Sequence, residues 1–237
     1  MNCLERQSGG TNTMVGDPAR HGAAGKAEDR WNNGSVSEPA FRAFLDESSP
    51  SRGAGHREYM VCAAFISTET CEATREQLRP LLLPGQIKLH WSDESERRRR
   101  SIVARIVELG PMNVVVSHLD KYQRRVERHR KKCLEVLYHQ MVAMQVFDLT
   151  LECRSDAQDK GDRAHIVALQ NQGLDRRIRI GHARGGDEPL LWIADAVLGA
   201  INSSHHGEGR HIERLRSTIL LDERTPGSLQ PLQSERP

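Results

Sequence analysis

Hydrophobic residues in the middle of the chain fall either into short continuous runs or into stretches with helical spacing. The segment Tyr59–Ile66 is apolar throughout, which is typical of a strand buried on both faces of a sheet. Further short apolar runs predict five more strands, at Phe41–Leu45, Ile87–Trp91, Asn113–Leu119, Leu149–Arg154 and Arg177–Ala183.

Between these runs, apolar residues recur at every third or fourth position. One stripe includes Ile102, Val103 and Ile106, in a helix that Ser92 can cap and that Gly110 ends. The other predicted helices are Thr68–Leu82, Val126–Val146, Asp162–Gln170 and Pro189–Asn202. Strands that alternate with helices predict an α/β domain with a mixed central sheet and helices on both faces.

The composition divides the chain into three parts. Residues 1–38 are rich in Gly, Ser, Asn and charged residues without apolar periodicity, and they are expected to form a disordered tail. Residues 224–237 have the same character. The intervening residues 39–223 are expected to form a single domain.

Charge and cysteine content exclude several classes of protein. The chain has 34 Lys and Arg against 32 Asp and Glu, a net charge of +2, which argues against bulk polycation behaviour. No apolar run approaches the roughly 20 residues that span a bilayer, so no membrane partner is expected. The five cysteines are odd in number and have no C-x-x-C spacing, which argues against a disulfide scaffold or a thiolate zinc site. A reducing cytoplasm is the expected location.

Acidic residues stand in unusual positions next to or inside apolar elements. Asp46 and Glu47 follow the first strand directly, and Asp120 follows another. Glu152 lies within a strand, and Asp195 interrupts an otherwise apolar helix. A carboxylate in such company is costly unless it is paired or bound to a cation. If these side chains converge, their repulsion raises their pKa values, and Mg²⁺ or Mn²⁺ would suit the oxygen-rich site.

Each of these acidic residues also has a purely structural interpretation. Acidic residues at strand ends, such as Asp46 and Asp120, often form turns or helix caps. Glu152 has arginines near it in sequence, including Arg154, with which it can form an ion pair.

His90 and a run of arginines are further candidates. His90 is a candidate general base or metal ligand, or else a hydrogen-bonded core residue. The run Arg97, Arg98, Arg99 and Arg100 is either a solvated helix face or a surface that contacts the phosphates of nucleic acid. The sequence has no P-loop, no dinucleotide-binding fingerprint and no G-x-S-x-G motif.

Three segments together resemble a known family. They are Phe44–Ser48, the strand Tyr59–Ile66 and Leu191–Asp195, and they look like the domain of unknown function 3800 family, which is marked by an early D-E pair and a late Q-x-x-D. The resemblance implies a ribonuclease H-like fold, in which acidic residues from the first strand, a central strand and a late helix bind a divalent metal.

The family motifs correspond to only a few positions of this chain. Asp46 and Glu47 match the early pair, and Asp195 matches the late Asp, whereas Trp192 replaces the usual Gln. The resemblance does not decide whether Asp120 or Glu152 completes the site.

These observations lead to two functional hypotheses. The first is a metal-dependent nuclease or phosphodiester hydrolase of ribonuclease H-like type. Its metal ligands would be Asp46, Glu152 and Asp195, assisted by Asp120 or Glu47. His90 would carry a proton, and Arg97–Arg100 would hold the phosphate backbone. The alternative is a non-catalytic module on the same fold that binds nucleic acid or protein.

Overall fold

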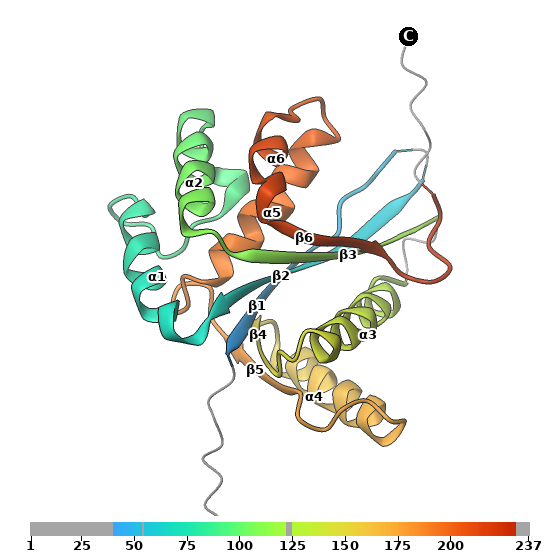
Figure 1. Ribbon diagram of the computed structural model, residues 1–237. Helices are drawn as coiled ribbons and strands as arrows, with labels where there is room; N and C mark the ends of the chain where they lie inside the picture. Colours follow the sequence, from blue (N-terminus) through green and yellow to red (C-terminus); the bar gives the residue numbers. More distant parts are fainter. Residues whose placement is uncertain (1–39, 54, 122–124, 231–237) are drawn as a thin grey trace, which may run out of the picture. The chain divides into compact units, whose positions relative to one another are not determined.

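The computed structural model describes residues 40–53, 55–121 and 125–230, and these residues contain one six-stranded sheet in the order β5-β4-β1-β2-β3-β6 (Figure 1). The strands are β1 (Phe41–Ser48), β2 (Arg57–Ser67), β3 (Met112–Asp120), β4 (Asp148–Glu152), β5 (Arg179–Ala183) and β6 (Ile219–Arg224). Strand β2 is antiparallel to both its neighbours, and the other pairings are parallel. The carboxyl ends of β1, β3 and β4 therefore lie at the same edge of the sheet.

Helices cover both faces of the sheet (Figure 1). The helices α1 (Cys71–Leu78), α2 (Glu96–Leu109), α5 (Leu191–Ser204) and α6 (Arg210–Leu215) belong to one face, which we call the α5 face. The opposite α3 face is covered by α3 (Val126–Ala143) and α4 (Asp156–Asn171). The predicted α/β class, mixed sheet and two-sided helical cover are confirmed.

Side-chain alternation along the strands divides the core in two. Phe44 of β1 packs in the core of the α5 face, whereas its neighbour Leu45 packs in the core of the α3 face. The central strand β2 contributes to both cores, which explains why Tyr59–Ile66 is apolar at every position. Whether an acidic residue lies above or below the sheet thus depends on its parity along its strand.

Several elements differ from the predictions in their type or bounds, and two of these differences have a clear physical cause. Ile87–Trp91 forms no strand, because its buried side chains, Leu89 and Trp91, pack against α5 without backbone pairing to the sheet. Helix α4 begins at Asp156, earlier than predicted, because Ser155 and Gln158 form a capping box.

Ordered structure also continues past the predicted domain boundary at residue 223. Strand β6 includes Arg224, and Thr225 is buried. The predicted N-terminal tail, residues 1–38, lies outside the described residues, as do residues 231–237.

The helices and cysteines of the described residues give two simple findings. None of these helices is both long enough and apolar enough to cross a membrane. Cys62, Cys71, Cys133 and Cys153 are free thiols, and the first three are buried.

A glycine in α5 makes room for the Trp91 indole. A Cβ atom at Gly199 would collide with the Trp91 ring. We expect Gly199→Ala to lower the free energy of unfolding by about 1–3 kcal/mol, because the ring has to move. Gly161 is a matched control in α4, where a Cβ meets nothing within 4 Å. Gly161→Ala should raise stability by about 0.5–1 kcal/mol. Urea unfolding of both variants tests the pair, and equal effects would contradict the packing described.

Candidate metal centre at the carboxyl edge of the sheet

Three of the predicted acidic residues meet on the α5 face. Asp46 directly follows the buried residues of β1, Glu152 ends β4, and Asp195 lies in α5. Because Leu45 is opposite Leu151 in the parallel β1–β4 pair, the next residues along, Asp46 and Glu152, come side by side. All three carboxylates line one cleft of about 580 Å³. We call it the acidic cleft.

Asp46 carries the strongest electrostatic perturbation in this cleft. Burial, followed by repulsion from Asp195, raises the pKa of the Asp46 carboxyl from 3.8 to about 8, with a further contribution from Glu152. Among the described residues, its hydrogen-bond donor is the backbone N–H of Glu47, at 2.8 Å. An ionised Asp46 is therefore costly unless a cation joins it.

The other two carboxylates each have a basic partner from the segment before α2. Lys88 Nζ donates to Glu152 Oε1 at 2.6 Å. His90 Nδ1 lies 2.9 Å from Asp195 Oδ1, and the Trp91 backbone N–H donates to Asp195 Oδ2 at 2.7 Å. The hydrogen bond to Asp195 raises the pKa of His90. Asp195 thus also holds this segment against α5.

The donor set of the acidic cleft fits a hard divalent ion such as Mg²⁺ or Mn²⁺. It offers carboxylate oxygens and no sulfur, and Asp46 bears the buried charge that an ion would relieve. The three residues do not form a preformed cage, because their oxygens do not all lie within 4.8 Å of one another, unlike two other groups in the described chain. Two of the carboxylates instead have basic partners within the chain, because Lys88 pairs with Glu152 and His90 pairs with Asp195.

Glu47 also lines the acidic cleft, but its carboxylate is paired on the other face of the sheet, and Asp120 is not part of the lining. Glu47 follows Asp46, so its side chain turns to the α3 face, where it accepts from Arg130 Nε at 2.6 Å. Asp120 shares its parity with Val116, a residue of the core on the α3 face. It pairs with the first residue of β2, Arg57, well beyond the register of Asp46, and its Oδ2 lies 3.2 Å from His129 Nε2.

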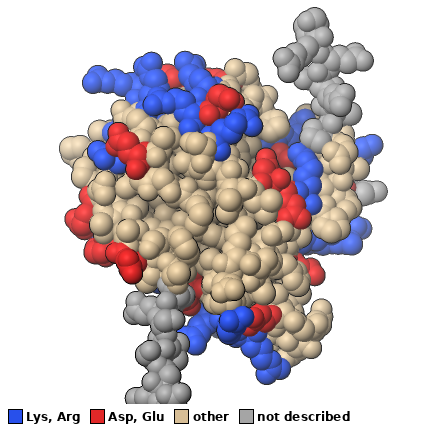
Figure 2. Space-filling view, viewed as in Figure 1, with Lys and Arg blue, Asp and Glu red and all other residues tan. Residues whose placement is uncertain are grey.

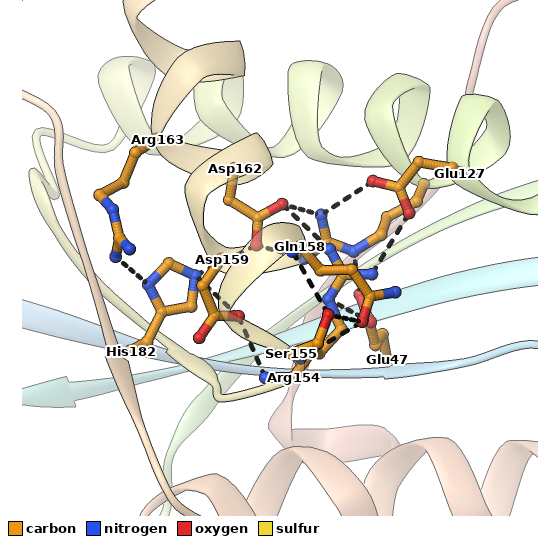
Figure 3. A network of polar contacts seen from close by, with 10 residues as sticks. Glu47, Glu127, Arg154, Ser155, Gln158, Asp159, Asp162, Arg163 and His182 are labelled. Atoms are coloured by element: carbon orange, nitrogen blue, oxygen red, sulfur yellow. Dashed lines mark hydrogen bonds and ion pairs between the residues drawn. The ribbon is translucent and has the colours of Figure 1, made fainter.

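A dense network of ion pairs surrounds Arg130 on the α3 face. Arg130 is 1% exposed and donates to both carboxylate oxygens of Asp162 as well as to Glu47. Figure 3 shows how Arg154 and His182 approach Asp162 from other sides, at 3.2 and 3.1 Å. Burial favours the neutral carboxyl, but the hydrogen bonds from Arg130 and His182 outweigh it and lower the pKa of Asp162.

This network includes one of the two compact groups of metal-ligand atoms, Asp159, Asp162 and His182. Its charge is already balanced, because the guanidinium groups of Arg130 and Arg154 both contact Asp162. The cluster therefore has the character of a structural ion-pair network.

The predicted arginine run begins α2 and divides among several partners. Arg99 lines the acidic cleft, and its guanidinium carbon lies 5.2 Å from the centre of the Trp91 ring. Arg98 turns away to Glu94 and to the Leu81 carbonyl, and Arg100 lies 3.9 Å from Glu96. Figure 2 shows basic side chains gathered with acidic ones at the top of the view, over α2 and α6. Of the four residues, Arg99 alone lines the cleft.

Several polar residues of the cleft escaped the sequence analysis. Lys88, Ser48 and Asn202 line it, and Asn202 Nδ2 donates to Ser48 Oγ at 2.9 Å. Asn202 stands two helical turns after Asp195 in α5, so helical periodicity could have found it. Lys88 lies in a segment without regular structure, and no local signal indicated its partner.

Trp192, which replaces the Gln of the resembled family, supports the rim of the site. Its indole N–H donates to the Gly185 carbonyl at 2.6 Å. A Cβ at Gly185 would meet Glu152 Oε1 at 2.5 Å. Trp192 thus anchors the loop that packs on Glu152.

The similarities of this chain to known proteins are distant. No family model matches the sequence, and no curated protein matches it. Among solved structures, RNase HII from Archaeoglobus fulgidus in its PCNA complex is similar over 73% of this chain and 76% of its own, with 14% identity and a TM-score of 0.38. Bst-RNase HIII is similar as its Q54A mutant, over 71% of this chain and 55% of that one, with 12% identity and a TM-score of 0.38.

Bst-RNase HIII in complex with Mn²⁺ is similar over 71% of this chain and 56% of its own, with 9% identity and a TM-score of 0.37. The chain spans little more than half the length of the RNase HIII chains. At this level of similarity, these likenesses carry no conclusion about fold or activity. The strand order and directions described above define an α/β domain with a mixed six-stranded sheet.

Proposed function

We propose that this chain is a divalent-metal-dependent nuclease or related phosphodiester hydrolase, in keeping with its resemblance to the domain of unknown function 3800 family. The observation that carries the proposal is the meeting of Asp46, Glu152 and Asp195 in one cleft, where Asp46 has a pKa of about 8. These carboxylates would hold Mg²⁺ or Mn²⁺, which when bound supplies an activated water and charge stabilisation at the leaving oxygen.

The other residues of the cleft have complementary roles in this proposal. His90 holds a proton at Nδ1 against Asp195 and can pass it to a leaving group. Arg99 contributes a positive charge at the cleft wall, where a phosphate backbone would run. Arg97, Arg98 and Arg100 would contribute to the wider basic surface of α2. Nucleic acid is thus the proposed substrate class.

The Lys88–Glu152 ion pair favours a second candidate function. It satisfies Glu152 at 2.6 Å without a metal ion. A non-catalytic module that binds nucleic acid through the same surface would keep this pair closed. The nuclease would need a divalent metal to cleave nucleic acid, whereas the binding module would bind nucleic acid without a metal.

Cleavage assays with matched variants test the proposal. We expect the protein to cleave labelled RNA, DNA or an RNA–DNA hybrid with Mn²⁺ or Mg²⁺, and to lose activity with EDTA. Asp195→Asn and Glu152→Gln should each lower the rate at least ~100-fold, because each removes a metal ligand. Asp175→Asn changes a half-buried carboxylate that is paired with Arg177 outside the cleft, and it should leave the rate unchanged.

Two results would overturn the nuclease proposal. One is a protein that cleaves none of these substrates and shows no Mn²⁺-dependent shift in melting temperature. The other is activity that survives in Asp195→Asn. Binding of an oligonucleotide without cleavage, unaffected by EDTA, would instead support the binding module.

A further inference from the structure

A second group of metal-ligand side chains lies on the α3 face, apart from the acidic cleft. His118 and Asp120 have the same parity at the end of β3, and His129 lies in the first turn of α3. One ligand atom from each residue falls within 4.8 Å of the others. The sequence analysis named Asp120 as a metal ligand beside Asp46, and the structure groups it with His118 and His129.

The hydrogen bonds around this group orient its ring nitrogens. His118 Nδ1 lies 2.5 Å from Thr225 Oγ1, so this hydroxyl orients the ring and leaves Nε2 directed to the group. A histidine that binds a metal is usually held in place by a hydrogen bond at its other ring nitrogen. His129 Nε2 lies 3.2 Å from Asp120 Oδ2. That spacing is close to the ~3.4 Å between ligands of a tetrahedral ion with bonds of about 2.0–2.1 Å.

The ammonium group beside these ligand atoms differs from the guanidinium groups of the Arg130 network. There, buried guanidinium groups make short contacts to Asp162. Here, Lys132 Nζ lies 3.5 Å from His118 Nε2, and the lysine is half-buried on a flexible stem. An ammonium group of this kind can leave for solvent when another cation arrives.

The geometry points to a binding site for a transition-metal ion of the Zn²⁺ class, with His118 Nε2, His129 Nε2 and an Asp120 carboxylate oxygen as ligands and Lys132 as the group that the ion displaces. Two imidazoles and one carboxylate suit Zn²⁺, Co²⁺ or Ni²⁺ better than Mg²⁺, which prefers oxygen ligands. The bound ion would connect β3 to α3. Through Thr225, it would also tie down the segment after β6.

Metal titrations of the full chain test this site independently of the acidic cleft. We expect one Co²⁺ per chain to bind, in the presence of saturating Mg²⁺, with the visible absorption of a tetrahedral or five-coordinate site. Zn²⁺ should compete for it and raise the melting temperature. His129→Gln should weaken binding at least ~50-fold, and Lys132→Met should tighten it about five-fold, because a positive charge beside the ligands is removed.

Matched variants distinguish binding at this site from binding at surface histidines or in the acidic cleft. His139→Gln changes an exposed histidine of the same helix and should bind Co²⁺ as the wild type does. Asp195→Asn, in the acidic cleft, should also bind it normally, whether or not the nuclease proposal holds. A His129→Gln variant that folds, by circular dichroism, and binds Co²⁺ as tightly as the wild type would overturn the inference. So would a Lys132→Met variant that binds no more tightly.

Discussion

The Arg130→Met variant is expected to lose about 3–5 kcal/mol of its free energy of unfolding, because a buried ion-pair network loses its central cation. Arg130 is 1% exposed and contacts both Asp162 and Glu47. Without it, the partners of Asp162 that remain among the described residues are Arg154 and His182, and desolvation of its carboxylate is less well compensated. Urea unfolding at neutral pH measures the loss.

Two companion variants give this prediction its control. Arg216→Met removes an arginine of similar size whose pair with Glu213 is exposed, and it should change stability by less than about 0.5 kcal/mol. The double variant Arg130→Met, Asp162→Asn should recover part of the loss, because it removes the unpaired charge. If Arg130→Met were no more harmful than Arg216→Met, the network would contribute nothing to the stability of the fold.

The acidic cleft was predictable because its residues break the pattern of the elements that carry them. Asp195 interrupts an apolar helix, and Glu152 points away from Leu149 and Leu151 in its strand. The structure brings these two together with Asp46, as expected. An acidic residue inside a regular element is informative because the period of the element fixes which way it faces.

The surroundings of Glu47 and Asp120 were harder to predict than those of Asp46. Adjacent residues of a strand face opposite sides, so the Glu47 carboxylate pairs with Arg130 on the α3 face although Glu47 also lines the acidic cleft. To predict whether Asp120 lies near Asp46, the order of the strands must be known as well. Strand β2 lies between β1 and β3, and this order cannot be read from periodicity.

The partners of the carboxylates were beyond local sequence reasoning. Lys88 and His90 come from a segment whose apolar alternation resembles a strand, yet α5 and not a neighbouring strand receives its side chains. The early start of α4 was, in contrast, readable from the capping-box spacing of Ser155 and Gln158. Local signals are thus sufficient to locate the end of a helix, whereas pairings between distant segments can be found only from the fold.

The two faces of the sheet treat buried carboxylates in opposite ways. On the α3 face, Asp162 is matched by guanidinium groups within the fold, and its pKa is lowered. On the α5 face, Asp46 has no such cation among the described residues, and its pKa is raised to about 8. The same fold thus neutralises the Asp162 carboxylate on one face and leaves the Asp46 carboxyl beside negative charges on the other. That contrast is why we propose the metal site at Asp46 and not at Asp162.

The Asp46→Asn variant is expected to be more stable than the wild type in the absence of metal, and increasingly so as the pH rises. The carboxyl has an ordinary pKa of 3.8, against about 8 in the folded protein. Between about pH 4 and pH 8 the folded state therefore holds a proton that the unfolded state releases, so wild-type stability falls as the pH rises through this window. Asparagine has no such proton. A difference of about four pKa units makes the gain near zero at pH 4 and on the order of 5 kcal/mol at pH 8.

Divalent metal should reverse this order of stability. With saturating Mn²⁺ at pH 8, the wild type should gain melting temperature and Asp46→Asn should gain little, because the variant lacks the carboxylate that an ion stabilises. Binding of Mn²⁺ to the wild type near pH 7 should also release a proton, which calorimetry in buffers of different ionisation enthalpy detects. Asp175→Asn is the control of opposite sign. Its pairing with Arg177 lowers the pKa of Asp175, so this variant should gain no stability as the pH rises. A wild type and an Asp46→Asn variant with parallel pH profiles would show that Asp46 ionises normally, and the electrostatic argument for a metal at this cleft would fail with it.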